Sequence, residues 1–189
     1  MRYVLDIKQC TLLGKGAEGS VYLTPEGFAL KIFYKTKNAK QEVEILEKAE
    51  KSRFFPKVLF IARNMVLREY VDGITLKDYL SEHELSYKLS TEIIDLIEDF
   101  KALKFSRINM RNAHIFVDEN ENIKVIDPRK TYTKYTPYPK DIIKILVELD
   151  IFDTFLKNVL DYRGDLIPYW ISAYDFYKNK SIKIYMYAS

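Results

Sequence analysis

Three glycines near the start of the chain, Gly14, Gly16 and Gly19, form the pattern G-x-G-x-x-G. In a dinucleotide-binding fold the third glycine of this pattern opens a helix. Here strand-forming residues follow it, and after a turn at 25–27 comes a second strand-forming run at 28–33. The order predicts antiparallel strands with a glycine-rich flap and disfavours the dinucleotide-binding fold. Backbone N–H groups of such a flap can approach and bind phosphate oxygens.

Lys31 lies inside the second strand-forming run, between apolar residues. A lysine in an apolar strand is costly unless it is paired or exposed. The next segment, 38–52, has apolar residues at helical spacing and charges on the other face, which predicts an amphipathic helix. One of its glutamates can reach Lys31 if the helix packs on the sheet. The alternative is that Lys31 is an edge residue that points to solvent.

The remaining periodic segments predict further strands early in the chain and helices later in it. The additional strands are expected at 3–13, 56–61 and 65–70. An additional helical region is expected within 81–104, where apolar residues from 93 to 103 recur at helical spacing. Further helices are expected at 140–146, 151–161 and 166–178. This order favours an α+β fold.

A β-rich pair, 115–117 and 123–126, is joined by a polar turn and predicts a hairpin. The hairpin carries polar residues at both ends: Asn109, Arg111 and His114 before it, and Asp127 after it. Such a rim suits a metal or phosphate site, although many hairpins with polar ends hold no site.

Composition and charge narrow the function classes. The chain has 189 residues, and its net charge of +3 is too small to indicate a nucleic-acid partner. Cys10 is the single cysteine, which excludes an internal disulfide, and we expect it to be a small core residue. Charges interrupt the N-terminal apolar run, and no apolar run approaches the ~20 residues that span a bilayer. We therefore expect a cytoplasmic protein with no membrane span.

The glycine pattern, then Ala29-Leu30-Lys31, then a helix that begins its apolar face after Glu42, is similar to the small lobe of protein kinases. The resemblance covers roughly residues 11–149, and the short chain resembles minimal bacterial and archaeal kinase-like proteins of the atypical or lipopolysaccharide-kinase type. It implies two lobes. Residues 1–71 would form an N-lobe with a five-stranded antiparallel sheet and one helix. Residues 72–189 would form a shortened helical C-lobe that carries the hairpin.

The resemblance implies an ATP site in the first lobe. Lys31 would contact the phosphates and Glu42 would hold it, with Glu44 as the second choice. The segment 69–71 would bind adenine through its backbone, and Arg68 stands where the family usually has an apolar residue or threonine at the back of the pocket. The nucleotide-binding residues implied are Gly14, Gly16, Gly19, Val21, Ala29, Lys31, Glu69 and Val71.

The resemblance also places the catalytic loop at the hairpin, with altered chemistry. Asn109 stands at the position of the base and His114 at that of the second metal ligand. Arg111 keeps a cation on the loop. Asp127, with Pro128 and Arg129 after it, stands at the metal-binding aspartate. Lys31, Glu42, Asn109 and Arg111 are thus the implied catalytic residues, and Asp127 and His114 the implied metal ligands.

The function implied is an ATP-binding, serine/threonine-type phosphotransferase that uses Mg²⁺ or Mn²⁺. Imidazole suits Mn²⁺ better than Mg²⁺, so His114 favours Mn²⁺. The alternative is a pseudokinase that acts as a nucleotide-binding switch or scaffold, because the amide of Asn109 cannot accept a proton as a carboxylate does. A third reading is a kinase-shaped scaffold without nucleotide, with Arg68 in the pocket. The substrate stays open between a protein, a small molecule and a lipid-linked sugar.

Overall fold

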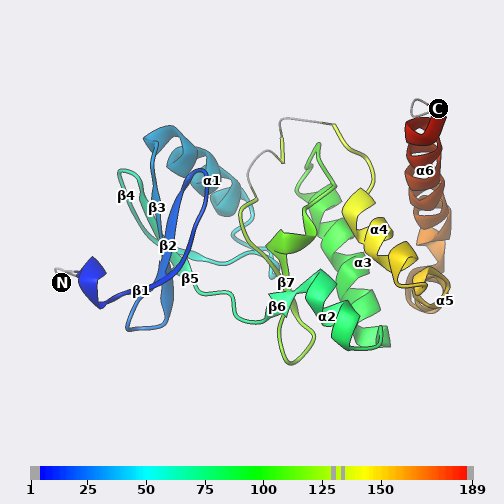
Figure 1. Ribbon diagram of the computed structural model, residues 1–189, viewed down its shortest axis with the longest axis horizontal. Coiled ribbons are helices and arrows are strands. Elements are labelled where there is room, and N and C mark those ends of the chain that lie inside the picture. Colours follow the sequence, from blue (N-terminus) through cyan, green and yellow to red (C-terminus); the bar gives the residue numbers. More distant parts are fainter. Residues whose placement is uncertain (1–4, 129–130, 133–134, 187–189) are drawn as a thin grey trace. The chain divides into compact units, whose positions relative to one another are not determined.

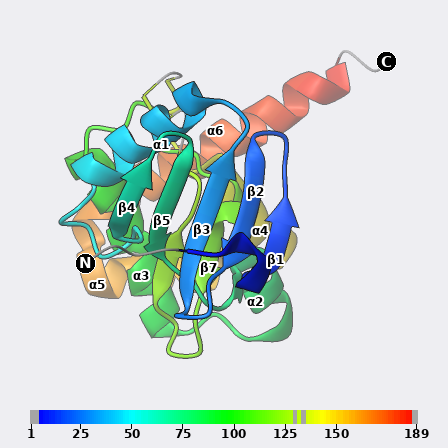
Figure 2. The same cartoon turned by 90° about the vertical axis from the view of Figure 1, so that its left-hand side faces the viewer.

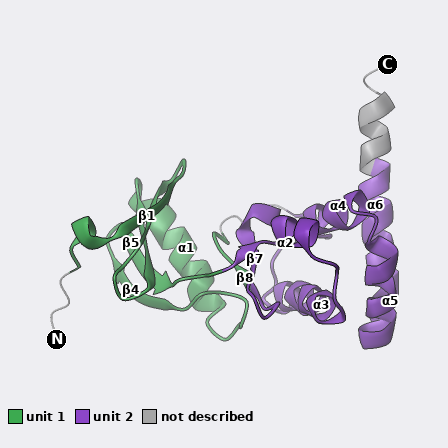
Figure 3. Cartoon of the chain, turned by 60° about the horizontal axis from the view of Figure 1, so that its bottom comes forward, with its two compact units in different colours: residues 1–72, 124–129 green, residues 73–123, 130–189 purple. Residues whose placement is uncertain are grey.

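The computed structural model describes residues 5–128, 131, 132 and 135–186 (Figure 1). The chain forms two compact units, which Figure 3 distinguishes by colour. The first comprises residues 1–72 and 124–129, and the second comprises residues 73–123 and 130–189. Within the described residues, no helix combines the length and apolar character needed to cross a membrane.

The first unit is built on a five-stranded antiparallel sheet with the strand order β1-β2-β3-β5-β4, which Figure 2 shows face on. Tight turns join neighbouring strands: Gly27 has a φ of 84° between β2 and β3, and Arg63 has a φ of 49° between β4 and β5. The strands are β1 (Thr11–Lys15), β2 (Gly19–Leu23), β3 (Phe28–Phe33), β4 (Val58–Ala62) and β5 (Met65–Glu69). β3 therefore lies in the middle of the sheet.

Helix α1 (Thr36–Lys48) packs against β3, β4 and β5. Ala39 and Val43 on its apolar face join Phe33 and Val66 of the sheet in a buried cluster, with Val58 packed against it. The amphipathic pattern of the helix thus buries one face on the sheet, as the spacing of its apolar residues predicts. This packing determines which helical side chains reach β3.

The predicted strand at 3–13 is wrong in its first part. A 3₁₀ turn, η1 (Ile7–Gln9), precedes β1, because the carboxylate of Asp6 accepts a hydrogen bond from the backbone N–H of Lys8 and caps the turn. Tyr3 lies outside the described residues. Cys10 ends the turn and is only partly buried, so it is not the core residue that we expected.

The second unit is mainly helical. Its helices are α2 (Leu76–Glu82), α3 (Tyr87–Ala102), α4 (Lys140–Glu148), α5 (Phe152–Arg163) and α6 (Ile167–Met186), with 3₁₀ turns η2 (Asn112–His114) and η3 (Gly164–Leu166). A three-stranded sheet has the order β6 (Ile74–Thr75), β7 (Ile115–Val117) and β8 (Ile123–Val125), and residues 124 and 125 of β8 are assigned to the first unit. The helix expected within 81–104 is confirmed as α3, which begins after Ser86, whose side-chain oxygen accepts a hydrogen bond from the N–H of Leu89 at 2.9 Å.

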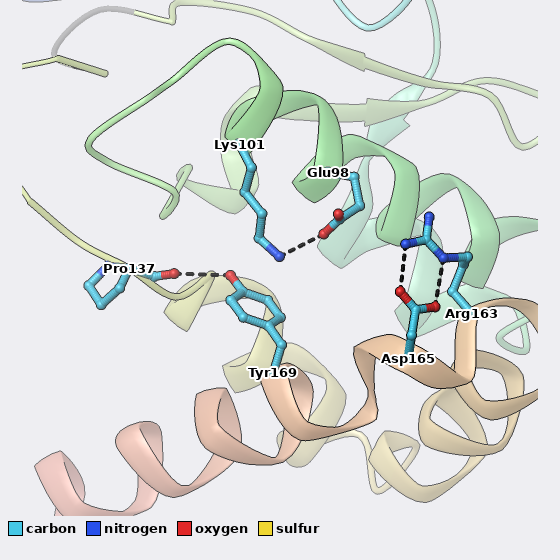
Figure 4. A network of polar contacts seen from close by, with 6 residues as sticks. All are labelled: Glu98, Lys101, Pro137, Arg163, Asp165 and Tyr169. Carbon is cyan, nitrogen blue, oxygen red and sulfur yellow. Dashed lines mark hydrogen bonds and ion pairs between the residues drawn. The ribbon is translucent and has the colours of Figure 1, made fainter.

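The helices of the second unit bury many apolar side chains. The rings of Phe155 on α5 and Trp170 on α6 meet edge to face, with centroids 4.7 Å apart. Beside these rings, Lys101 Nζ lies 2.6 Å from Oε1 of Glu98 and 3.4 Å from the ring centroid of Tyr169 (Figure 4). The hydroxyl of Tyr169 donates a hydrogen bond to the carbonyl of Pro137 at 3.0 Å. Burial raises the pKa of Tyr169, so the phenol stays protonated and remains a donor.

Candidate functional site

Lys31 lies at the centre of the five-stranded sheet. Its partners across the neighbouring strands are Val21 on β2 and Val66 on β5, and only 7% of Lys31 is exposed. The alternative that Lys31 is a solvent-facing edge residue is therefore wrong, because β3 is an interior strand. An ammonium group at such a position requires a charged partner.

Helix α1 supplies the partner. The Nζ of Lys31 lies 2.5 Å from Oε2 of Glu42, which is fully buried. Glu44, two residues further along the helix, is exposed. Burial raises the pKa of the Glu42 carboxyl, while the positive charges of Lys31 and Arg68 act in the opposite direction.

Asp127 brings a second carboxylate to Lys31 from a distant part of the chain. Its Oδ1 accepts a hydrogen bond from Lys31 Nζ at 3.2 Å. The segment 124–129 belongs to the first unit, where the backbone N–H of Val125 donates to the carbonyl of Phe54 at 2.7 Å. Asp127 has a φ of 52°, a left-handed conformation that costs energy in a residue other than glycine. Such strained backbone is concentrated at functional sites.

Arg68 is also part of this charged cluster. The kinase resemblance places Arg68 at the back of the implied pocket, where the sequence leaves both a pairing with Glu42 and surface exposure open. Only 4% of Arg68 is exposed, which excludes a surface position. It pairs in register with Ala29, two residues from Lys31 on the same strand, and so lies on the face of the sheet that carries Lys31. Burial lowers the pKa of the Arg68 guanidinium, and the charges of Glu42 and Asp127 oppose that shift. The cluster thus contains two cations and two carboxylates.

The three glycines of the flap have different surroundings. A Cβ on Gly19 would lie 2.1 Å from the carbonyl oxygen of Ile32, so the close approach of β2 and β3 requires glycine there. A Cβ on Gly14 or Gly16 would meet nothing within 4 Å. Open space beside these two positions leaves room for a ligand to approach the backbone, whereas Gly19 is explained by strand packing. Of the residues implied for nucleotide binding, Val21 pairs with Lys31.

The segment implied for adenine binding begins at the end of β5. The N–H of Glu69 donates to the carbonyl of Lys57 at 3.0 Å, and Glu69 Oε2 accepts from the N–H of Lys57 at 3.1 Å. Lys124 Nζ lies 3.8 Å from the same carboxylate. Val71 follows it as a partly buried residue. Contacts with Lys57 and Lys124 thus hold Glu69 in place.

The second unit contains Asn109, Arg111 and His114. Asn109 makes two hydrogen bonds with Asp141 at the start of α4: its Oδ1 accepts from the backbone N–H at 2.7 Å, and its Nδ2 donates to Oδ1 at 3.1 Å. Asn112 Nδ2 donates to the carbonyl of Asp141 at 3.0 Å. Arg111 is exposed, and His114 is partly buried in η2. Asp141 was not predicted to belong to the site, and no local signal in the sequence indicates its pairing with Asn109.

The two predicted metal ligands belong to different units: Asp127 to the first and His114 to the second. Throughout the residues that the structure describes, no group of three or more His, Cys, Asp or Glu side chains is placed to hold a metal ion. Arg129, at the end of the implied Asp127-Pro128-Arg129 motif, lies outside the described residues. In the first unit, Asp127 lies beside the Lys31–Glu42 pair.

Comparison with known proteins yields no matching family model. The chain is 30% identical over 128 residues to a Bacillus subtilis (strain 168) protein named "Putative serine/threonine-protein kinase YrzF". The matched region is 64% of this chain and 59% of that relative, so the chain spans about three fifths of the relative's length. This similarity indicates a kinase-like relationship and agrees with an α+β fold built on a five-stranded antiparallel sheet.

Proposed function

We propose that the chain is an ATP-binding phosphotransferase of the kinase type. The observation that carries this proposal is the contact of Lys31 with both Glu42 and Asp127, on a sheet whose first hairpin is a glycine-rich flap. Burying a lysine between two carboxylates costs desolvation free energy, so such a pair adds little to stability. Strongly coupled charges of this kind are typical of functional sites. The similarity to the Bacillus subtilis protein supports kinase and transferase at that general level.

Each member of the cluster has a role in this proposal. Glu42 holds the ammonium group of Lys31, which supplies a positive point charge to the nucleotide phosphates. The backbone at Gly14 and Gly16 covers the phosphates, and Val21 and Ala29 contact the adenine that the backbone at Glu69 and Val71 binds. These roles follow the kinase resemblance. They use the face of the sheet that carries Lys31.

We propose that the site uses Mg²⁺ or Mn²⁺. Mg²⁺ in nucleotide sites is commonly bound by one or two carboxylates, with phosphate oxygens and waters as its other ligands. Asp127 provides one such carboxylate. We assign His114 as the second protein ligand, and its imidazole nitrogen favours Mn²⁺. The metal would neutralise charge on the phosphates during transfer.

A serine or threonine hydroxyl of a protein is the acceptor that we propose, with small molecules and lipid-linked sugars as the competing classes. We propose a cytoplasmic location for the reaction. Arg111 is exposed on the loop, where its charge is available to the transferred phosphate.

A nucleotide-binding switch without transfer is the second candidate function. It is favoured by one observation: both polar atoms of the Asn109 side chain are occupied by Asp141. An amide also cannot act as a base at neutral pH. Phosphoryl transfer depends mainly on positioning and charge stabilisation, so the absence of a carboxylate at 109 does not by itself exclude turnover.

Transfer of labelled γ-phosphate separates the two candidates. The wild-type chain, incubated with labelled ATP and either Mn²⁺ or Mg²⁺, should label itself or an added protein substrate, faster with Mn²⁺. Asp127→Ala should abolish this labelling, because it removes the metal-binding carboxylate. Nucleotide binding without labelling would assign the switch function, and neither binding nor labelling would exclude both.

A further inference from the structure

The outer edge of strand β4 is open. The five-stranded sheet ends at β4, and among the described residues no other strand pairs with its outer side (Figure 2). An edge strand presents backbone N–H and C=O groups to which another strand can add, and proteins commonly protect such edges with charged residues or proline. The five residues of β4, Val-Leu-Phe-Ile-Ala, include neither. This edge is therefore suited to pairing with a further strand.

Apolar side chains project from both faces of the β4 edge. Leu59, Phe60 and Ile61 are 49%, 61% and 43% exposed. Ile61 pairs with Val66, which is buried in the cluster with helix α1, so Ile61 lies on the helix face of the sheet. Phe60 pairs with Leu67 and lies on the opposite face. A strand added to the edge covers apolar groups on both faces, whereas a helix laid against one face leaves the other exposed.

The residues of β4 are complementary to a second copy of the same strand. A bulge interrupts the pairing with β5 after Val58, and the register is regular from Phe60 to Ala62. An antiparallel pairing about a two-fold axis at Ile61 sets the two Ile61 side chains against each other on the helix face. On the opposite face it sets each Phe60 ring beside the small side chain of Ala62. Large and small groups therefore alternate along the seam.

The charges around this edge are complementary in the same arrangement. A groove of about 720 Å³ lies between β4 and the end of helix α1, and its charged lining residues are Glu47, Glu50 and Lys57. Two carboxylates and one ammonium group make the groove acidic. Arg63, in the turn directly after β4, is exposed. Because the end of one strand meets the start of the other in an antiparallel pair, each Arg63 comes beside the acidic groove of the other copy.

We propose that the chain forms a two-fold dimer through β4, in which the two five-stranded sheets join edge to edge. The same surface of each copy forms both halves of the contact, so the assembly closes at two copies. Backbone hydrogen bonds between the strands hold the pair, the apolar side chains exclude water from both faces, and the two contacts of Arg63 with the acidic groove fix the register. The interface lies within the first unit and does not require the proposed transferase activity.

Sedimentation of the whole chain over a range of concentrations tests the dimer. The mass of wild type should rise towards twice the 22.4 kDa of one chain. Phe60→Arg places a charge in the seam and should weaken self-association at least about tenfold. Its melting temperature should stay within a few degrees of wild type, because residue 60 is mostly exposed. Leu12→Arg, a change of an exposed apolar residue on β1 at the opposite edge of the sheet, is the matched control and should dimerise like wild type.

Charge reversal separates this pairing from unspecific apolar association. Arg63→Glu should weaken the dimer, and so should Glu47→Lys combined with Glu50→Lys, because each change sets like charges against each other. A variant that carries all three changes exchanges the signs on both sides of the contact. It should therefore recover dimerisation, which an unspecific apolar contact would not do.

A cross-link tests the register. In a Cys10→Ser background, Ile61→Cys places one thiol from each copy beside the two-fold axis, within reach of a short bismaleimide. The cross-linked dimer should form with Ile61→Cys and not with Leu12→Cys on β1.

Several outcomes would overturn the dimer. A single species of 22.4 kDa at every concentration at which the chain stays dissolved would exclude it and leave the edge to a strand of another protein. Undiminished self-association of Phe60→Arg would place the contact elsewhere. Growth beyond two copies, or no recovery in the variant with all three charge changes, would show that the association is unspecific.

Discussion

At the scale of single residues, the feature that matters most is the buried charge of Lys31. Lys31 and Glu42 are both withdrawn from water, with side chains 9% and 0% exposed. Burying such a pair contributes little net stability, but removing one partner leaves an uncompensated buried charge. The pair is therefore better explained by a function that needs a positioned ammonium group than by stability.

Lys31→Met should lower the free energy of unfolding by about 3–5 kcal/mol, because the Glu42 carboxylate loses its closest cation. The loss should be smaller in Lys31→Met combined with Glu42→Gln, since no unpaired carboxylate then remains at the helix. Urea denaturation of the two single variants and the double variant measures this coupling. Glu44→Gln, an exposed change on the same helix, serves as the control and should be nearly neutral. Additive losses in the double variant would show that the two charges are not coupled.

The burial of Arg68 shows where inference from sequence stops at this scale. Lys31 could be identified from sequence because an apolar strand surrounds it and a glycine flap precedes it. The resemblance singled out Arg68, but its burial could not be decided from sequence, because alternation along β5 groups it with Val66 and does not say which face is buried. Helix α1 packs on that face, and this long-range contact determines the environment of Arg68. The pairing of Asn109 with Asp141 was missed for the same reason.

At the scale of elements, substitutions in the flap should distinguish a glycine that strand packing requires from one that faces the ligand. Gly19→Ala should destabilise the first unit by about 1–3 kcal/mol, because a Cβ there would overlap the carbonyl of Ile32 on β3. Gly16→Ala should change stability little, since its Cβ would meet no atom within 4 Å, and should weaken ATP binding by narrowing the approach to the backbone. Thermal unfolding of both variants measures the change in stability, and ATP titration measures the change in affinity. Equal stability losses at both positions would contradict the distinction.

The turn between β7 and β8 should show a defined pH dependence. Partial burial raises the pKa of Asp118, but hydrogen bonds from Asn122 and from the N–H of Asn120 outweigh it and hold the pKa below its ordinary value. An acid with a lowered pKa stabilises the fold above its unfolded pKa and loses that contribution as the pH falls through the folded value. Asp118→Ala should therefore cost about 1 kcal/mol at pH 7.

The cost of Asp118→Ala should shrink below about pH 4, because the carboxylate of the unfolded chain takes up a proton there while the folded one is still ionised, and should vanish once the folded carboxylate is protonated as well. Urea unfolding of both chains at pH 7 and pH 3 measures the change. A difference in stability that is the same at both pH values would show that the charge of Asp118 does not stabilise the turn.

Local sequence patterns predicted most helices and strands, because in those segments the hydrophobic periodicity matches the face that is buried in the fold. The run at 28–33 became β3 with the expected bounds, and the helix after it became α1. The error arose at the first predicted strand, where a capping side chain interrupts the hydrophobic pattern. Asp6 caps a 3₁₀ turn there. This cap is a single hydrogen bond that periodicity alone does not reveal.

At the scale of the whole molecule, the first unit closes its charged cluster with a segment from late in the chain. Lys31 and Asp127 are 96 residues apart in the sequence. The intervening part of the sequence includes residues 73–123, which belong to the second unit. The similarity to the Bacillus subtilis protein covers 64% of the chain. The α+β fold and the kinase-like relationship were therefore predictable from ordered motifs, whereas ATP, metal and substrate remain proposals.

The central claim is that Lys31, held by Glu42, binds the phosphates of ATP and that Asp127 binds the metal. Calorimetric titration with ATP in the presence of Mn²⁺ or Mg²⁺ tests it on wild type, Asp127→Asn and the exposed control Glu44→Gln. We predict that wild type and Glu44→Gln bind equally, more tightly with Mn²⁺, and that Asp127→Asn binds at least about tenfold more weakly, a loss of about 1.4 kcal/mol. Absence of binding by wild type, or undiminished metal-dependent binding by Asp127→Asn, would contradict the claim.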